Sequence, residues 1–384
     1  MEISQQLRQI TGSATAQIFS QAKELEAQGK DIVHLEIGQP DFSPPDVVIE
    51  ATVQALHDKK TAYTVSRGIA PLRKAIADRH NSENDADLDY RHEVIVTAGA
   101  KLGIFGALWS VVNPGDNVIV LNPSWVSYGD IVSSLGAEPR YVTAALDFTV
   151  DDQELMANID HQTKAMIVNS PSNPTGGLIT KENLIKLVRI CREHEVLLIS
   201  DEIYSDYLYD EGTHYSLLEM DNWNEVGVVI NGFSKTFSMT GFRLGYVLGK
   251  STIIDQVNKV MQLTASCAVN FAQEAAIVAL EHIGEMRSFI KSTMAERRQL
   301  VVELFHEIGV DFQAPQGAIY AWFKVPSTDS AAWTSKLLEE EGVALTPGVA
   351  FGPAGEGYAR LCFAVDHEQL RKGITRIGSF LHAH

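Results

Sequence analysis

The sequence predicts an α/β protein with a large domain, built on a mostly parallel β-sheet covered by helices, and a smaller α+β domain. Between residues 93 and 249, short apolar runs rich in β-branched residues alternate with helix-like segments. Beyond Cys267 this rhythm is replaced by a long helical pattern and then by short mixed segments. A chain of 384 residues with 45% hydrophobic residues can also bury one large core and a smaller second one.

The expected strands of the large sheet are six apolar runs: "EVIVTA", "NVIVLN", "KAMIVNS", "VLLIS", "GVVING" and "GYVLG". They lack the apolar/polar alternation of half-exposed strands, as buried parallel strands do. Ligands of such sheets bind at the carboxyl ends of the strands. Polar residues that follow these runs are therefore the first candidates for a functional site.

Helical patterns flank this region on both sides. The segment "ATAQIFSQAKELEAQG" places Ile18, Ala22 and Leu25 on one face and ends at Gly29, as a helix would. Periodicity does not decide whether this helix joins the second domain. After the large sheet, the long helix "EMRSFIKSTMAERRQLVVELFHEIG" leads to "PQGAIYAWF", "GVALTPG" and "YARLCFA", which we expect to form the small domain.

Composition and charge argue against several classes of function. A formal net charge of −18 and a pI near 5.1 oppose broad contact with nucleic acid, because such proteins concentrate Lys and Arg. The start "MEISQQLRQITGS" has no apolar core of signal-peptide length, and no segment approaches the ~18 apolar residues of a membrane span. We expect a soluble, cytoplasmic protein without a membrane or nucleic-acid partner.

The cysteine and histidine patterns do not indicate a metal site. Cys191, Cys267 and Cys362 are scattered, without a CxxC pair, so we expect three small core residues in a reducing compartment. No HExxH pattern occurs among the 12 histidines. We expect no bound metal.

The stretch "GFSKTFSMTGFR" places Lys235 in apolar and aromatic surroundings. A partly desolvated amine has a lowered pKa and becomes a nucleophile. Asp201 ends the run "VLLISD", Tyr204 follows it, and Asn173 stands in the Asn-Pro turn of "NSPSNPTG". Taken singly, they are typical of a helix N-cap, a surface tyrosine and a simple turn. Together with Arg243, they form a set in which every member stands at or just beyond an expected strand end.

This order and spacing resemble the fold-type I, pyridoxal-phosphate-dependent aminotransferases of class I/II, and most closely the bacterial aspartate aminotransferases. The resemblance runs from the N-terminal helix to Arg360, nearly the whole chain. It implies a seven-stranded sheet in a large cofactor-binding domain at 47–283 and a small domain at 284–384, which the N-terminal segment 1–46 joins. It also implies pyridoxal 5′-phosphate as the cofactor.

For the cofactor ring, the resemblance assigns five residues. Lys235 would bind the cofactor covalently and later move a proton at the substrate α-carbon, which requires a neutral amine. Asp201 would pair with the protonated pyridine nitrogen. Tyr204 and Asn173 would hydrogen-bond the phenolic oxygen of the ring, and Trp125 in "NPSW" would stack on the ring face.

For the cofactor phosphate, Arg243 supplies a planar guanidinium group. Gly99 and Ala100 stand at an expected strand-to-helix junction, where free backbone N–H groups favour an anion. Related proteins often carry a serine three residues before the lysine, where this chain has Gly232. That departure removes one phosphate contact or passes it to a neighbour such as Ser234.

Tyr63 in "AYTVSRG" resembles the tyrosine that reaches the phosphate in the other subunit of dimeric relatives. The resemblance therefore implies a homodimer with shared active sites. Arg67 in the same segment could add positive charge near the substrate or simply face solvent, and the sequence leaves both interpretations open.

For the substrate, Arg360 in "YARLCFA" resembles the arginine that binds the α-carboxylate, and Gly38 in "LEIGQPDF" matches a glycine that offers a backbone N–H. Without the resemblance, Arg360 could equally be a surface charge on an edge strand. Trp125 and Asn173 would contact the substrate as well as the cofactor.

Lys101 in "GAK" resembles a lysine that meets the distal carboxylate of the substrate in one bacterial branch, aided by hydroxyls such as Ser13 and Thr15 in "SAT". Lys101 is also a candidate contact of the cofactor. The alternative is a solvated lysine on the first helical turn and an ordinary N-cap serine. A lysine near a helix N-terminus is mildly unfavourable electrostatically, which favours the functional interpretation.

The expected activity is transamination of an L-amino acid, aspartate or another dicarboxylic one, with a 2-oxo acid such as 2-oxoglutarate by a ping-pong mechanism. Aromatic residues in "PQGAIYAWF" and "TPGVAFG" leave a broad, aromatic or alanine-type aminotransferase open. A further alternative is a biosynthetic enzyme that uses the same cofactor for elimination, racemisation or cyclisation. A non-catalytic sensing module would carry a basic DNA-binding domain ahead of the fold, whereas only the segment 1–46 precedes the large domain here.

Overall fold

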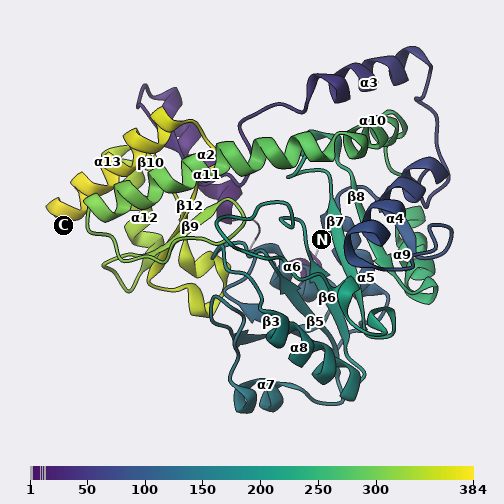
Figure 1. Cartoon of the computed structure of the whole chain (residues 1–384). Helices are drawn as coiled ribbons and strands as arrows, with labels where there is room; N and C mark the ends of the chain where they lie inside the picture. Colours follow the sequence, from purple (N-terminus) through teal and green to yellow (C-terminus); the bar gives the residue numbers. More distant parts are fainter. Residues whose placement is uncertain (1–2, 9, 11, 13) are drawn as a thin grey trace.

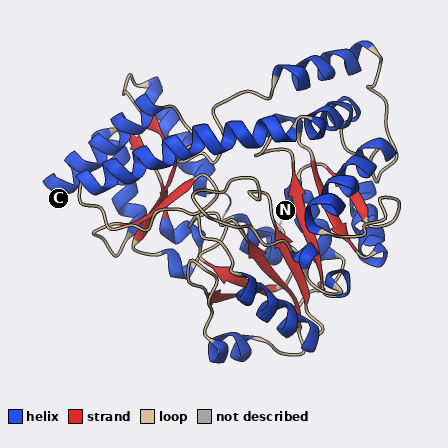
Figure 2. Cartoon of the chain, viewed as in Figure 1, coloured by secondary structure: helices blue, strands red, loops and turns tan. Residues whose placement is uncertain are grey.

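A computed structural model of the chain describes residues 3–8, 10, 12 and 14–384 (Figure 1). The large domain is a seven-stranded, mostly parallel sheet with helices on both faces, and the small domain combines helices with a short antiparallel sheet (Figure 2). These features confirm the expected fold class. In this described part of the chain, no helix is both long enough and apolar enough to span a bilayer.

The strands of the large sheet pair in the order β2-β8-β7-β6-β5-β3-β4. β8 runs antiparallel to both of its neighbours, and the other pairs are parallel. The strands are β2 (Val94–Thr97), β3 (Asn117–Asn122), β4 (Glu138–Thr143), β5 (Thr163–Asn169), β6 (Leu197–Asp201), β7 (Gly227–Gly232) and β8 (Gly245–Gly249).

The six apolar runs predicted from the sequence form β2, β3, β5, β6, β7 and β8. The sequence analysis did not identify β4, whose segment reads "EPRYVT". This strand lies at the edge of the sheet, and Val142 is its only buried residue. Its polar composition does not indicate a buried strand, because an edge strand needs less apolar surface than a central one.

Two hydrophobic clusters cover the two faces of the sheet. Consecutive residues of β2 show the division, because Val94 and Val96 belong to one cluster and Ile95 to the other. The first cluster takes residues from α3 (Asp46–His57), α4 (Ala70–Asn84), α7 (Asp152–Asn158), α8 (Lys181–Glu193) and α10 (Asn270–Glu281). The second takes residues from α5 (Ala100–Trp109), α6 (Ser127–Ser134) and α9 (Ser251–Thr264).

The long helix α11 (Ile283–Glu307) runs from the end of α10 into the small domain, where it lies beside α13 (Figure 1). Its residues Ile290, Val301 and Phe305 are part of the small-domain core. That domain also contains α12 (Ser330–Glu341), α13 (His367–Ala383), β9 (Tyr320–Lys324), β11 (Thr346–Pro347) and β12 (Tyr358–Cys362). Short 3-10 helices lie at Leu217–Glu219, Trp223–Glu225, Thr240–Phe242, Gly348–Phe351 and Pro353–Gly355.

The N-terminal segment lies on the small domain. After α1 (Gln5–Arg8) and α2 (Ala14–Ala27), β1 (Val33–His34) pairs in parallel with β10 (Val343–Ala344). The apolar face predicted for the helix packs against Leu338 and Ala344 of the small domain through three residues: Ile18, Ala22 and Leu25. We therefore propose the division expected from the sequence: a large domain at 47–283 and a small domain at 284–384, which the N-terminal segment 1–46 joins.

Two positions differ from the sequence-based expectations. Cys267 is only half-buried, because it lies in the loop between α9 and α10, whereas Cys191 and Cys362 are buried. Arg243 does not follow a strand but precedes β8. Because β8 is antiparallel to β7, its first residues lie at the edge where β7 ends, with Gly232 opposite Gly245. Arg243 therefore still reaches the carboxyl edge of the sheet.

Candidate active site

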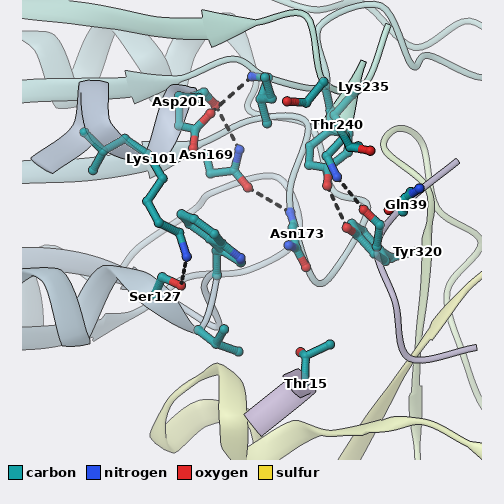
Figure 3. A pocket seen from close by; sticks show the side chains of 18 of the residues that line it. Thr15, Gln39, Lys101, Ser127, Asn169, Asn173, Asp201, Lys235, Thr240 and Tyr320 are labelled. Atoms are coloured by element: carbon teal, nitrogen blue, oxygen red, sulfur yellow. Dashed lines mark hydrogen bonds between the residues drawn. The ribbon is translucent and has the colours of Figure 1, made fainter. Parts of the chain in front are cut away.

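A cavity of about 350 Å³ lies between the carboxyl edge of the large sheet and the small domain (Figure 3). Most of the residues predicted for the site line it: Thr15, Gly38, Ala100, Lys101, Trp125, Asn173, Asp201, Tyr204, Ser234, Lys235, Arg243 and Arg360. The lining also includes residues that the sequence analysis did not identify: Ser127, Tyr128, Asn169, Thr240 and Tyr320.

Lys235 follows β7 by three residues and lines the cavity. Its amine donates a hydrogen bond to the carbonyl of Gly38, and the Tyr207 hydroxyl donates to the Lys235 carbonyl at 2.8 Å. Burial lowers the pKa of the Lys235 amine to about 8. A neutral fraction that grows as the pH approaches this value suits both a nucleophile and a proton carrier.

Asp201 is the last residue of β6, and only 4% of it is exposed. The Tyr128 hydroxyl donates a hydrogen bond to its carboxylate at 2.7 Å, and the Ile203 N–H donates another at 3.2 Å. Burial raises the pKa of Asp201 to about 6, although both hydrogen bonds act in the opposite direction. Such a carboxylate is ionised at neutral pH, and a cationic or N–H partner in the cavity would stabilise its charge.

Two asparagines connect this carboxylate strand to the small domain. Asn169, the last residue of β5, donates from its amide to the Asp201 carbonyl at 2.9 Å and accepts from the Asn173 N–H at 2.9 Å (Figure 3). The side-chain oxygen of Asn173 in turn accepts from Arg360 at 3.0 Å. Asn169 therefore holds the turn that presents Asn173.

Arg360 lies on β12, and only 3% of it is exposed. Besides Asn173, its guanidinium donates to the Glu36 carbonyl and to Thr346 at 3.2 Å, but no carboxylate is paired with it in the described structure. Its Nε is buried without a hydrogen-bond partner. A buried cation with an unused donor is costly, and a bound anion relieves that cost. The edge-strand alternative is wrong, because Arg360 is buried in the central strand of the small sheet.

Tyr204 follows Asp201 in a turn, and its hydroxyl pairs with the hydroxyl of Tyr320 at 2.6 Å. Both side chains are buried, and burial raises the pKa of Tyr204 well above its usual value. Tyr320 also explains Gly38, because a Cβ at that position would lie 2.1 Å from the Tyr320 hydroxyl. The two tyrosines thus present neutral hydroxyl groups beside Lys235.

The other end of the cavity is suited to a phosphate. Gly99 is the N-cap of α5, with a φ of 86°, and a Cβ there would lie 2.5 Å from Nη2 of Arg243. The guanidinium therefore sits against the N-terminus of a helix, where free N–H groups also favour an anion. Ser234 and Thr240 line the same cavity and add hydroxyl groups.

The structure also explains Gly232. A Cβ at this position would lie 3.0 Å from both the Gly245 Cα and the Leu244 carbonyl oxygen. A serine would therefore push the backbone of the neighbouring strand. A serine at this position would fit only if that backbone moved by a few tenths of an ångström.

Lys101, on the first turn of α5, donates to Ser127 at 3.2 Å, and its amine lies 4.8 Å from the centre of the Trp125 ring (Figure 3). Burial and the neighbouring Arg243 lower the pKa of Lys101. Lys101 as a whole is exposed, so its contact with a distal carboxylate stays a prediction. Thr15, at the start of α2, lines the cavity on another side.

Four predicted residues are not among the lining residues of this cavity. Gly99 lies against the guanidinium of Arg243, which does line it. Tyr63 is 87% exposed and lines a separate hollow with Val269 and Asn270. Arg67 forms an ion pair with Asp255 and hydrogen bonds to backbone carbonyls, and within its own chain it does not line this cavity. Ser13 lies outside the described residues.

The residues in this cavity fit pyridoxal 5′-phosphate, which the resemblance implies. The ligand needs an amine for its aldehyde, a carboxylate for its ring nitrogen and an anion site for its phosphate. Lys235, Asp201 and the Arg243 cradle at Gly99 supply these groups within one cavity. Arg360 with its unpaired Nε remains for a second anion.

Comparisons with known proteins agree with this geometry. Residues 30–377 match the family described as aminotransferase class I and II. The chain is 38% identical to an aspartate aminotransferase of Thermotoga maritima, over 99% of this chain and all of that protein. It is 37% identical to the (5-formylfuran-3-yl)methyl phosphate transaminase of Methanocaldococcus jannaschii, again over 99% of this chain and all of that protein.

Among solved structures, the aspartate aminotransferase of Thermus thermophilus with maleate superposes on this chain with a TM-score of 0.94. The two sequences are 35% identical, and the match covers 99% of this chain and 100% of the other. At this level of identity, the likeness extends to the family as well as the fold.

We predict that Tyr128→Phe weakens cofactor binding on the acid side. The Tyr128 hydrogen bond favours the ionised form of Asp201, so its loss raises the pKa of Asp201 above about 6. A hydrogen bond to a charged group contributes ~1.5 kcal/mol, which corresponds to about one pH unit. The dissociation constant of pyridoxal 5′-phosphate, measured by absorbance against pH, should begin to rise about one unit earlier on acidification. An unchanged acid limb, the same as in the control Tyr141→Phe on β4, would contradict this prediction.

Proposed function

Since this chain belongs to the class I and II aminotransferases, a family of pyridoxal-phosphate-dependent transferases, we propose that it transfers the amino group of a dicarboxylic L-amino acid, such as aspartate, to a 2-oxo acid such as 2-oxoglutarate. The observation that carries this proposal is that two residues line one cavity: Lys235, whose amine has a lowered pKa, and Arg360, whose Nε has no hydrogen-bond partner in the described structure. Because the amino acid and the 2-oxo acid would occupy the same site, they would bind one after the other, as in a ping-pong mechanism.

The cofactor residues follow from the geometry above. Bound pyridoxal 5′-phosphate supplies an electron-withdrawing pyridine ring that stabilises the charge left when the substrate α-proton is removed. Asp201 would keep the ring nitrogen protonated, and Trp125 would pack on the ring face. Arg243 and the N–H groups at Gly99 and Ala100 would hold the phosphate, with hydroxyls from Ser234 and Thr240 nearby.

The substrate α-carboxylate binds Arg360 in a bidentate manner, and Asn173 orients the guanidinium through its side-chain oxygen. The α-carbon would then face Lys235, whose neutral amine would take and later return the α-proton. Tyr204 and Asn173 would hydrogen-bond the phenolic oxygen of the cofactor and hold the ring plane. The reverse transfer to the 2-oxo acid uses the same groups.

Lys101 is the residue we propose for the distal carboxylate of the substrate. Its amine lies 4.8 Å from the centre of the Trp125 ring, and Ser127 is its only hydrogen-bond partner in the described structure. Thr15 would complete this end of the cavity, and Ser13, two positions before it, lies outside the described residues. The related Thermus structure contains maleate, a dicarboxylate, which supports the assignment.

A broader specificity is the second candidate. Relatives of similar identity carry other names, including an aromatic-amino-acid aminotransferase of Thermococcus litoralis at 32% identity. The cavity has aromatic walls at Trp125 and Tyr320, which would also accept an aromatic side chain. The charge of Lys101 favours the dicarboxylic substrate.

We also propose a homodimer with shared active sites. Four large side chains on neighbouring segments are exposed, which is unusual for a monomer: Tyr63, Val65, Leu263 and Val269. Gln262 and Ser66 join these segments through a hydrogen bond at 3.2 Å. A second copy that covers them would bring Tyr63 to the phosphate in its partner.

We expect Lys235→Ala to lower the turnover of aspartate with 2-oxoglutarate by roughly 10³-fold or more, because proton transfer loses its carrier. Formation of glutamate and oxaloacetate is the measurement, with Lys74→Ala, on the exposed face of α4, as the control. Normal turnover in Lys235→Ala would refute the mechanism. Release of ammonia and pyruvate from serine, whose β-hydroxyl is a leaving group, would instead indicate that the wild-type protein catalyses an elimination.

For the distal carboxylate, we predict that Lys101→Met raises the KM for aspartate roughly tenfold to a hundredfold, because a charge-assisted hydrogen bond is lost. The KM values for alanine and phenylalanine should stay unchanged, since neither carries a distal carboxylate. Equal effects on all three amino acids would assign Lys101 to the cofactor instead.

The dimer is tested with Leu263→Asp, which places a charge on the exposed patch. We expect the wild-type protein to sediment as a dimer and the variant as a monomer with weaker cofactor binding, because Tyr63 no longer reaches its partner. Ile185→Asp, at an exposed position on α8, is the control. A wild-type protein that sediments as a monomer at every concentration would exclude the shared site.

A further inference from the structure

Asp206 lies in the turn after β6, and its carboxylate is buried outside the cavity, with 3% of the side chain exposed. Arg79 donates to both of its oxygens at 3.1 and 3.2 Å, and the Nε of Arg287 donates at 2.6 Å. The Thr236 hydroxyl donates to the same carboxylate at 2.7 Å. Thr236 directly follows Lys235 in the chain.

The two arginines are themselves held by a second acid. Glu83 on α4 accepts two hydrogen bonds from Arg287, at 2.8 and 2.9 Å, and a longer one from Arg79. The result is a ring of two cations and two anions that joins α4, α11 and the turn after β6. Although burial raises it, Arg79 and Arg287 hold the pKa of Asp206 at about 2. The carboxylate is therefore always an acceptor for Thr236.

The same turn also contacts the backbone of Lys235 itself. Tyr207, the next residue after Asp206, donates its hydroxyl to the Lys235 carbonyl at 2.8 Å. Asp201 and Tyr204, which face the cavity, stand at the beginning of this turn. One segment of seven residues, 201–207, thus carries two side chains that face the cavity and two that hold the chain at the Lys235 carbonyl and at the Thr236 hydroxyl.

We propose that Asp206 is a positioning residue for Lys235: its carboxylate, fixed by Arg79 and Arg287, holds the Thr236 hydroxyl and so sets the backbone of the lysine relative to Asp201. The proposal rests on the proposed function, in which Lys235 must reach both the cofactor and the substrate α-proton. Misplacement of a reacting group by ~1 Å costs up to about a hundredfold in rate. Asp206 touches neither ligand and acts only through Thr236.

The matched pair Thr236→Val and Thr236→Ser tests this inference. Thr236 is buried, with 1% of it exposed. Valine has nearly the same shape but lacks the hydroxyl, whereas serine keeps the hydroxyl. We expect Thr236→Val to lower kcat by roughly tenfold to a hundredfold at an unchanged KM, and Thr236→Ser to restore most of it. The pH titration of the lysine-bound cofactor, followed by absorbance, should shift in Thr236→Val and not in Thr236→Ser.

A second readout uses cofactor-free protein and does not depend on turnover. The rate at which an amine reagent modifies Lys235, measured by peptide mass spectrometry, should change in Thr236→Val and in Asp206→Asn. Glu83→Gln is the control for Asp206→Asn, because it opens the ring of charges without touching Thr236. Thermal unfolding of each variant separates a general loss of stability from a displaced lysine.

The outcomes distinguish this inference from the proposed function. A wild-type protein that does not transaminate would defeat the proposed function, whatever the variants do. A wild type that transaminates, with Thr236→Val and Asp206→Asn equal to Glu83→Gln in titration and labelling rate, would overturn the positioning role. If Asp206→Asn fails to fold, the threonine pair alone decides.

Discussion

The site depends on an excess of positive charge around one cavity. Lys101, Lys235, Arg243 and Arg360 line one cavity, and Asp201 is the only acidic residue among the lining residues that the structure describes. Burial lowers the pKa of both lysines, and Arg360 keeps an unpaired Nε. Cations without counter-ions are costly in a protein interior, so the cavity is prepared for ligands with several anionic groups. The surface of the chain carries the opposite sign, with a formal net charge of −18 overall.

The architecture concentrates these charges because strand ends meet there. Asp201 and Asn169 end adjacent parallel strands, Lys235 follows a third, and Arg243 precedes an antiparallel fourth whose start lies at the same edge. The small domain adds Arg360 from its own sheet across the cavity. The distance from Asp201 and Lys235 to Arg360 is therefore a property of how the two domains sit together. Helix α11 and the N-terminal segment are the connections that set it.

Much of the site can be predicted from local sequence. The strand runs are continuous apolar segments, so the polar residues that follow them, such as Asp201 and Asn173, stand out in the sequence. Lys235 stands out because a lysine in apolar surroundings is unusual, and Arg243 lies in the same stretch of sequence. Tyr128, Asn169 and Tyr320 gave no such signal, because tyrosine and asparagine are ordinary residues within helices and strands. Their function comes from partners that are distant in sequence: Tyr128 and Asp201 are 73 positions apart.

The sequence by itself determined the fold class, the apolar runs of the central strands and many of the chemical groups that line the cavity, because strand composition and residue type are local properties. Only the tertiary structure decided which of these groups contact one another. It paired Asn173 with Arg360 across 187 positions, left Tyr63 on the surface, narrowed the space beside Gly232 and joined Asp206 to Thr236. These outcomes depend on the packing of two domains and on the order of strands in a sheet, and both arise from contacts between residues far apart in the chain.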